Sequence, residues 1–188
     1  RGGGVPPGVA PYLPGEGEEI GPTLVQHPDT AMIAFTGSRG VGLLINRQAA
    51  ETPPGQDHVK RVLAEMGGKN AIIVLDDADV ELAVEGILWS AFGTSGQRCT
   101  AASRVIVQEG VYEALQSRLV DAAESLRLGV GWDDETDVGP VINKPALEKI
   151  HSYTKIGVDE GAKLLTGGEV ATGNGLEDGF YYRPTIFG

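Results

Sequence analysis

The sequence predicts an α/β fold with largely parallel sheets. Short apolar runs rich in β-branched residues alternate along the chain with longer segments whose apolar residues recur at helical spacing. Alternation of this kind is typical of parallel strands joined by crossover helices. Glycine is abundant, with 28 residues among 188, so many tight turns are expected between these elements.

The first third of the chain is expected to form two helices and two strands. Residues 17–27 predict a short helix, because acidic side chains lie at its positive end. The apolar run 31–35 predicts a buried strand. Ser38 is a suitable N-cap for a helix that ends near Ala50, before two prolines and a glycine. Residues 60–66 predict a second strand, which two glycines terminate.

The middle of the chain predicts a strand followed by a helix. Residues 71–75 are apolar and β-branched, as in a buried strand. An acidic run then leads into a helix over residues 80–92. Leu82 and Trp89 extend the apolar surface around that helix, so we expect it to be deeply buried.

The remainder continues the same alternation. Residues 104–108 predict a strand, and residues 111–126 predict an amphipathic helix with one apolar face. Residues 144–161 predict a further helix. Residues 163–165 and 181–186 predict two more strands, separated by a glycine-rich turn region.

The charge and the cysteine count exclude several classes of partner. The net charge of −11 opposes binding to nucleic acid and to anionic membranes. No apolar run approaches the roughly 20 residues that span a bilayer. Cys99 is the single cysteine, which fits a reducing compartment, so we expect a cytoplasmic location, or the mitochondrial matrix in a eukaryote. The three histidines lack metal-ligand spacing, and we expect no metal site.

A glycine-bearing turn lies between the first predicted strand and the second predicted helix. The start of a helix offers free N–H groups and a partial positive charge, both of which favour an anion. Gly37 would let a ligand approach the backbone, and Ser38 adds a hydroxyl. The same residues also fit an ordinary turn capped by Ser38 that binds nothing, and the residues alone favour that simpler interpretation.

Two further residues are candidates for chemistry. Cys99 follows the end of the helix at 80–92, in a loop where a thiol could be held near a cleft. The alternative is an inert, buried cysteine. Glu65 lies at a strand end beside two glycines, where a carboxylate could accept a proton from water. The alternative is an ordinary surface glutamate, and these two residues can meet only through the fold.

Three motifs together resemble the aldehyde dehydrogenase superfamily. IAFTGSRGVG at 33–42 is similar to its cofactor-phosphate turn. AEMGGKN at 64–70 resembles the segment with its general base, and SGQRCTAASR at 95–104 resembles the segment with its nucleophilic cysteine. Their order and spacing also match, and similar segments cover nearly the whole chain.

The resemblance implies a covalent mechanism. Cys99 would attack the carbon of an aldehyde, and a hydride would pass from the thiohemiacetal to the nicotinamide of the cofactor. Glu65 would activate the water that hydrolyses the resulting thioester. Thr100, next to the nucleophile, would donate a hydrogen bond to a carboxylate of the substrate.

The resemblance also implies a cofactor site and a domain division. Gly37, Ser38 and Gly42 would contact the cofactor, which is NAD, with NADP as the alternative. The backbone at Met66 and Gly67 would lie by the nicotinamide. Residues 1–66 would be the C-terminal part of a Rossmann-like NAD(P)-binding domain. Residues 67–188 would be the N-terminal part of an α/β catalytic domain.

The stretch 45–74 narrows the resemblance. It is similar to the glutamate-γ-semialdehyde dehydrogenases, a branch of the superfamily that acts in proline catabolism. The substrate expected is therefore a small-molecule aldehyde, glutamate γ-semialdehyde. The variant QRCTA around Cys99 also suits other carboxylated semialdehydes, which stay open as substrates.

The chain lacks several segments of the family, so we expect it to be the central fragment of a longer enzyme. The resemblance also implies that this longer enzyme forms homo-oligomers. An early segment with an asparagine for the oxyanion is absent, as are segments for both riboses of the cofactor. Residues 1–188 alone are therefore expected to show negligible turnover, and a non-catalytic fragment is an alternative. A redox-sensing thiol is a third hypothesis, but it explains neither Glu65 nor the turn at Gly37.

Overall fold

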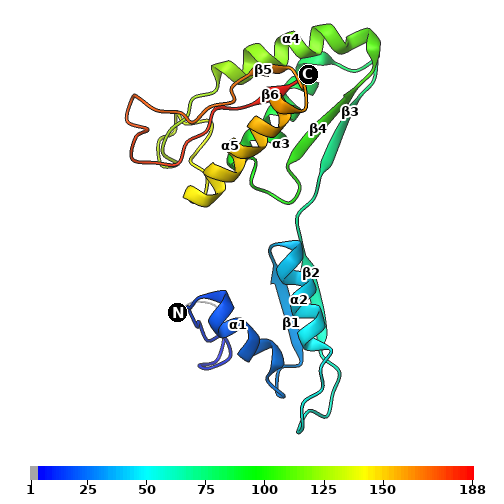
Figure 1. The fold of residues 1–188 in the computed structure, drawn as a ribbon, viewed down its shortest axis with the longest axis vertical. Coiled ribbons are helices and arrows are strands. Elements are labelled where there is room, and N and C mark those ends of the chain that lie inside the picture. The colour runs from blue at the N-terminus through cyan, green and yellow to red at the C-terminus, as the bar shows by residue number, and fades with distance from the viewer. Residues whose placement is uncertain (1–3) are drawn as a thin grey trace. The chain divides into compact units, whose positions relative to one another are not determined.

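The computed structural model describes residues 4–188, which form two compact units that meet in sequence between Gly67 and Gly68. This division lies one residue from the expected domain boundary. Mixed helices and strands in both units agree with the predicted α/β class (Figure 1). Within residues 4–188, no helix combines the length and the hydropathy needed to cross a bilayer.

The first unit contains a strand–helix–strand arrangement preceded by a helix. Its elements are α1 (Gly17–Gln26), β1 (Met32–Thr36), α2 (Arg39–Ala49) and β2 (Arg61–Glu65). Strands β1 and β2 pair in parallel, with α2 as the crossover helix (Figure 1). All four elements were predicted, and their ends agree within about two residues. The predicted burial of the first strand was wrong, because β1 alternates between exposed and half-buried residues and Met32 is 58% exposed.

Two polar contacts organise this unit. Ser38 is the N-cap of α2, and its Oγ accepts a hydrogen bond from the N–H of Val41 at 3.3 Å, as the sequence predicts. Lys60 is buried just before β2, and its Nζ donates to the carbonyl oxygen of Val25 at 2.9 Å. A cation near the last carbonyls of α1 is favourable, so Lys60 joins that helix to the strand pair.

The second unit opens with another parallel strand pair. Its first elements are β3 (Asn70–Val74), α3 (Val80–Phe92), a 3₁₀ turn η1 (Gly93–Gly96), β4 (Ala102–Val107) and α4 (Glu109–Ser125). Strand β3 pairs in parallel with β4, and the connection through α3 has the length that such a pair needs. The sequence predicted both strands and both helices.

The last elements are α5 (Lys144–Asp159), β5 (Leu164–Thr166) and β6 (Ile186–Phe187). Strands β5 and β6 pair antiparallel, whereas the other two pairs are parallel. The predicted strand over residues 181–186 was mostly wrong. Only Ile186 belongs to a regular strand, and Tyr182 makes an isolated bridge with Val170.

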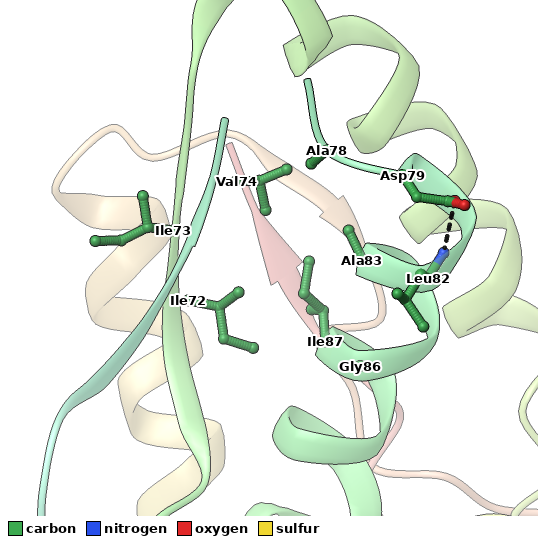
Figure 2. Close-up of a pocket in the computed structure, with 9 residues that line it drawn as sticks. All are labelled: Ile72, Ile73, Val74, Ala78, Asp79, Leu82, Ala83, Gly86 and Ile87. Carbon is green, nitrogen blue, oxygen red and sulfur yellow. Dashed lines mark hydrogen bonds between the residues drawn. The ribbon is translucent and has the colours of Figure 1, made fainter. Parts of the chain in front are cut away.

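The core of the second unit lies where β3 meets α3 and α4. Its buried members are Val74, Val84, Ile87, Leu115 and Leu119. Figure 2 shows Val74 of β3 facing α3 across an apolar groove, with Ile87 on the helix side. These side chains come from strand and helix positions that the sequence marked as apolar, so their burial fixes α3 and α4 on this strand pair.

The expectation that α3 is deeply buried was correct for one face of the helix and wrong for the face that carries Leu82 and Trp89. Val84 and Ile87 are buried, but Leu82 is 67% exposed and Trp89 is 68% exposed. The apolar surface of α3 therefore continues onto a face that residues 4–188 leave uncovered. Hydrophobic composition predicted the helix correctly but could not show which face is covered.

Candidate active site

The carboxyl ends of β1 and β2 bring together the turn at Gly37 and the residue Glu65. Thr36 and Glu65 are register partners at the ends of the two parallel strands. The N–H of Gly37 donates to the carbonyl oxygen of Glu65 at 3.0 Å. Ligands of α/β sheets bind at the carboxyl ends of the strands, so this edge is where a cofactor site is expected.

The N-terminus of α2 can receive an anion. Ser38 accepts the N–H of Val41 with its side chain and the N–H of Gly42 with its carbonyl oxygen at 2.9 Å. Arg39 and Gly40 are the first two residues of the helix, and their N–H groups have no intrahelical acceptor. A Cβ added at Gly40 would meet nothing within 4 Å. The exposed first turn therefore offers N–H donors to a phosphate group.

The reason for glycine at two of the candidate positions is packing. A Cβ at Gly37 would lie 2.5 Å from Cζ of Phe35, and a Cβ at Gly42 would lie 2.8 Å from Sδ of Met66. The ring of Phe35 thus occupies the space beside Gly37 that the sequence interpretation gave to a ligand. Met66 packs on Gly42 one turn into α2, which holds the segment that follows Glu65 against the helix.

The side chain of Glu65 is exposed at the end of β2, and Gly67 is also exposed. Met66 between them is half-buried. The first unit therefore brings five candidate residues together at the carboxyl ends of β1 and β2: Gly37, Ser38, Gly42, Glu65 and Met66. Cys99 and Thr100 belong to the second unit and are described within it.

Cys99 lies in the turn between η1 and β4. Its side chain is exposed, and so is that of Thr100. The alternative of a buried cysteine is therefore wrong for residues 4–188. An exposed thiol in a loop is accessible to a carbonyl compound, and its backbone contacts determine how firmly it is held.

The segment that precedes Cys99 has a strained backbone, and two side chains hold it in place. Thr94 and Ser95 have positive φ angles of 54° and 56°, an uncommon conformation outside glycine. The hydroxyl of Ser95 donates to the carbonyl oxygen of Gly139 at 2.8 Å. Oε1 of Gln97 accepts the N–H of Ile142 at 3.0 Å. The loop is thus attached to the segment 139–142.

Arg98 is directed toward α3, which the sequence could not show. Its guanidinium lies 4.2 Å from the centroid of the Trp89 ring and donates to the carbonyl oxygen of Trp89 at 3.1 Å. A cation over an indole ring and a hydrogen bond to the same residue fix this side chain. Arg98 therefore anchors the loop to the end of α3.

Asn70 is a residue of this region that the sequence analysis missed. Its Nδ2 donates to the carbonyl oxygen of Cys99 at 2.7 Å and to that of Ala101 at 3.2 Å. The two acceptors are 29 and 31 residues away along the chain, so no local pattern signals the contact. The only sequence signal was that Asn70 ends the motif AEMGGKN.

The second unit also has two grooves. The groove in Figure 2 is lined by apolar side chains and by Asp79, whose Oδ1 accepts the N–H of Leu82 at 3.1 Å as the cap of α3. A larger groove is lined by Ser95, Gly96 and Gln97 together with residues of α5. Neither lining includes Cys99 or Thr100, so neither groove is the candidate site.

Comparisons with known proteins agree with the three motifs. The chain is 48% identical over 184 residues to 1-pyrroline-5-carboxylate dehydrogenase of Geobacillus thermodenitrificans, and 46% identical to that of Bacillus subtilis. In both cases the match covers 98% of this chain and 35% of the relative. The chain thus spans about a third of the length of these curated relatives.

Solved structures give the same result. A crystal structure of 1-pyrroline-5-carboxylate dehydrogenase from Thermus with bound NAD matches 98% of this chain and 34% of its own, with a TM-score of 0.89 and 44% identity. A betaine aldehyde dehydrogenase from Staphylococcus aureus in complex with NAD+ matches 92% of this chain and 34% of its own, with a TM-score of 0.85 and 35% identity. The family model described as "Aldehyde dehydrogenase family" matches residues 2–188. The chain therefore belongs to the aldehyde dehydrogenase family.

Proposed function

We propose that this chain carries the nucleophile and the general base of an NAD-dependent enzyme that oxidises glutamate γ-semialdehyde to glutamate in proline catabolism. The observation that carries the proposal is the exposed thiol of Cys99, held in a hydrogen-bonded loop within a chain whose residues 2–188 match the aldehyde dehydrogenase family. Both candidate residues lie in the motifs that the sequence singled out. The domain roles proposed are a cofactor-binding part up to Met66 and a catalytic part after it.

The residues at the carboxyl ends of β1 and β2 are suited to bind a dinucleotide. The exposed first turn of α2 has N–H groups at Arg39 and Gly40 without intrahelical acceptors, and Ser38 adds a hydroxyl. We assign the cofactor phosphates to this turn, and the backbone at Met66 and Gly67 to the nicotinamide side. Gly37 and Gly42 contribute to this site because their missing side chains leave room for Phe35 and Met66 to pack beside the turn. When bound, NAD supplies the acceptor for the hydride that leaves the substrate carbon.

Cys99 acts first in this mechanism. Its thiolate attacks the aldehyde carbon and forms a C–S bond, and the carbonyl oxygen takes the negative charge of a thiohemiacetal. Loss of hydride from that carbon leaves a thioester on Cys99 and oxidises the aldehyde by two electrons. Glu65 then takes a proton from water, whose oxygen attacks the thioester carbon. The C–S bond breaks and expels the Cys99 thiolate, and the proton on Glu65 and that of the new carboxylic acid pass to solvent, which leaves the carboxylate product.

The substrate proposal rests on the name that several relatives share. Proteins 46–48% identical to this chain are called 1-pyrroline-5-carboxylate dehydrogenase, and the open form of that compound is glutamate γ-semialdehyde. Thr100 is exposed beside Cys99, and its hydroxyl is the donor we assign to a substrate carboxylate. NAD is the cofactor named with the Thermus structure. We propose the same cofactor here, a homo-oligomeric enzyme and a cytoplasmic location.

The experiment is an activity assay of the full-length protein, which follows the absorbance of the reduced cofactor. Glutamate γ-semialdehyde is compared with an uncharged aldehyde of the same chain length, and NAD with NADP. We expect the charged substrate and NAD to give the higher kcat/KM. Cys99→Ala should lose at least about 10³-fold in rate, because the C–S bond of the proposed mechanism cannot form without this thiol.

The matched control is Ser103→Ala, which removes a hydroxyl from β4, near Cys99 but outside the proposed chemistry. It should keep its rate within about threefold of the wild type, since its 3.4 Å contact with the carbonyl of Asn70 is weak. Retention of dehydrogenase activity by Cys99→Ala would overturn the proposed mechanism. Absence of activity in the wild type with every aldehyde would overturn the proposed function.

A further inference from the structure

The side-chain amide of Asn70 spans the turn that carries Cys99. Its single NH₂ group donates to the carbonyl oxygens of Cys99 and Ala101, at 2.7 Å and 3.2 Å. These two carbonyl groups flank Thr100, so one amide fixes the backbone on both sides of that residue. An NH₂ group has two hydrogens and can satisfy two acceptors at once.

Asn70 is itself fixed by its place in the sheet. It is the first residue of β3 and pairs with Ala102, the first residue of β4. The chain just before it also approaches the loop closely. A Cβ at Gly68 would lie 3.0 Å from the carbonyl oxygen of Cys99 and 3.3 Å from Nδ2 of Asn70. The absence of a side chain at Gly68 thus leaves room for this contact.

The contacts on the two sides of Cys99 differ. Before it, Ser95 and Gln97 bind the loop to residues 139–142. After it, the side chain of Ser90 accepts the N–H of Ala102 at 3.2 Å, while the carbonyl oxygens are held by Asn70. The carbonyl of Cys99 is one bond from the Cα that bears the thiol side chain. Rotation of that carbonyl therefore tilts the bond that carries the sulfur.

We propose that Asn70 is a positioning residue for Cys99. It acts through the backbone of the nucleophile and touches no reacting atom, and this inference rests on the proposed function. Asparagine is the required residue type because both partners are acceptors, so the side chain must donate. An aspartate of the same shape would place a carboxylate against two carbonyl oxygens. Displacement of a nucleophile by about 1 Å can cost on the order of 10² in rate.

The kinetic test compares Asn70→Ala and Asn70→Asp with a matched control in the full-length protein. The control is Asn143→Ala, which removes the cap of α5, where Oδ1 of Asn143 accepts the N–H of Ala146 at 2.9 Å. We expect kcat to fall about 10- to 100-fold in Asn70→Ala, with KM within about threefold of the wild type. The isosteric Asn70→Asp should be at least as impaired, and Asn143→Ala should keep kcat.

A second readout does not depend on activity. Hydrogen exchange of the amides at 98–101, measured by mass spectrometry on the full-length protein, should speed up at least about tenfold in Asn70→Ala, because the hydrogen bonds from Asn70 to this turn are lost. The same amides should exchange at the wild-type rate in Asn143→Ala. Unchanged exchange rates in Asn70→Ala would show that Asn70 does not restrain the backbone around Cys99, and would overturn the proposal whether or not the enzyme is active.

Failure of this inference differs from failure of the proposed function. If the wild type oxidises aldehydes and Asn70→Ala keeps its kcat, Asn70 does not position the nucleophile. A loss of kcat that Asn143→Ala shares, with an equal fall in melting temperature, would mean a general loss of stability and would also overturn it. A wild type without dehydrogenase activity would refute the proposed function, and with it the catalytic role of Asn70.

Discussion

At the scale of single residues, the roles of Cys99 and Glu65 can be separated by chemistry. Glu65→Gln keeps the shape of the side chain but cannot take a proton from water. We expect one equivalent of reduced cofactor per thiol to form rapidly, followed by turnover about 10²- to 10⁴-fold slower than in the wild type. The measurement is stopped-flow absorbance with substrate in excess.

Glu113→Gln in α4 is the matched control, since it removes an exposed carboxylate outside the candidate site. It should show the wild-type steady state. Loss of the initial phase in Glu65→Gln, with no cofactor reduced at all, would show that Glu65 is needed before the thioester forms and would refute its assignment as the base for hydrolysis.

The sequence identified residues whose role is local or carried by a motif. Ser38 caps α2 as predicted, and Asp79 caps α3 by accepting the N–H groups of Glu81 and Leu82. Asn70 could not be identified in this way, because its acceptors lie in a loop that only the β3–β4 pairing brings near. Local capping patterns are visible in sequence, whereas contacts across a sheet depend on register.

At the scale of elements, the N-terminus of α2 has two functions in this account, one in stability and one in cofactor binding. Ser38→Ala removes the cap hydrogen bond and should lower the free energy of unfolding by about 1 kcal/mol. It should also weaken NAD binding, because the hydroxyl lies at the turn assigned to the phosphates. Chemical denaturation and calorimetric titration of the full-length protein measure the two effects.

Asp79→Ala provides the control for that experiment, since it removes the cap of α3 in the other unit. It should cost a similar free energy of unfolding and leave the dissociation constant for NAD unchanged. Equal NAD affinities in Ser38→Ala and the wild type would contradict the assignment of the phosphates to this turn.

The loop before β2 should be sensitive to pH through His58. Hydrogen bonds with Asp57 and with the carbonyl of Thr30 raise the pKa of His58 above its ordinary value of 6.5. The charged form is therefore favoured in the folded state. Its stabilising effect is fully present below pH 6.5 and is lost as pH rises through the raised pKa.

The measurement is urea denaturation of the wild type and of His58→Gln at several pH values between 6 and 8. The wild type should lose stability relative to the variant as pH rises, because only His58 changes its charge in this contact. Parallel pH profiles for the two proteins would contradict this account of the loop.

Most elements were predicted because hydrophobic periodicity and caps are local. The pairing of the last strands was not. Residues 181–186 have the composition of a strand, but apart from Ile186 their backbone contacts form no regular ladder. The N–H of Ala171 donates to the carbonyl oxygen of Tyr181, and the N–H of Val141 donates to that of Phe180, just before this segment. The composition of a segment can predict an extended, half-buried backbone, but it cannot predict whether a partner strand runs alongside that segment.

At the scale of the whole molecule, residues 4–188 leave large apolar side chains uncovered in both units. Leu63, Ile73, Leu82, Trp89 and Ile106 are each more than half exposed. Contiguous apolar surface promotes association and dye binding. We expect residues 1–188 alone to bind the dye ANS and to sediment as associated species.

The control variant combines Ile73→Thr and Ile106→Thr, two exposed positions on the paired strands β3 and β4. It should bind less dye and associate less, with its helix content unchanged by circular dichroism. A monomer of residues 1–188 that binds no dye at concentrations of about 100 μM would contradict this description of the surface.

In the proposed mechanism, Cys99 forms a covalent acyl intermediate during aldehyde oxidation. The most direct measurement is peptide mass spectrometry of full-length Glu65→Gln, quenched in acid after mixing with NAD and glutamate γ-semialdehyde. We expect the mass of a glutamyl thioester on the peptide that contains Cys99, and no adduct when NAD is omitted or Cys99 is replaced by alanine. Rapid reduction of cofactor with an unmodified Cys99, or an acyl group on any other residue, would contradict this mechanism.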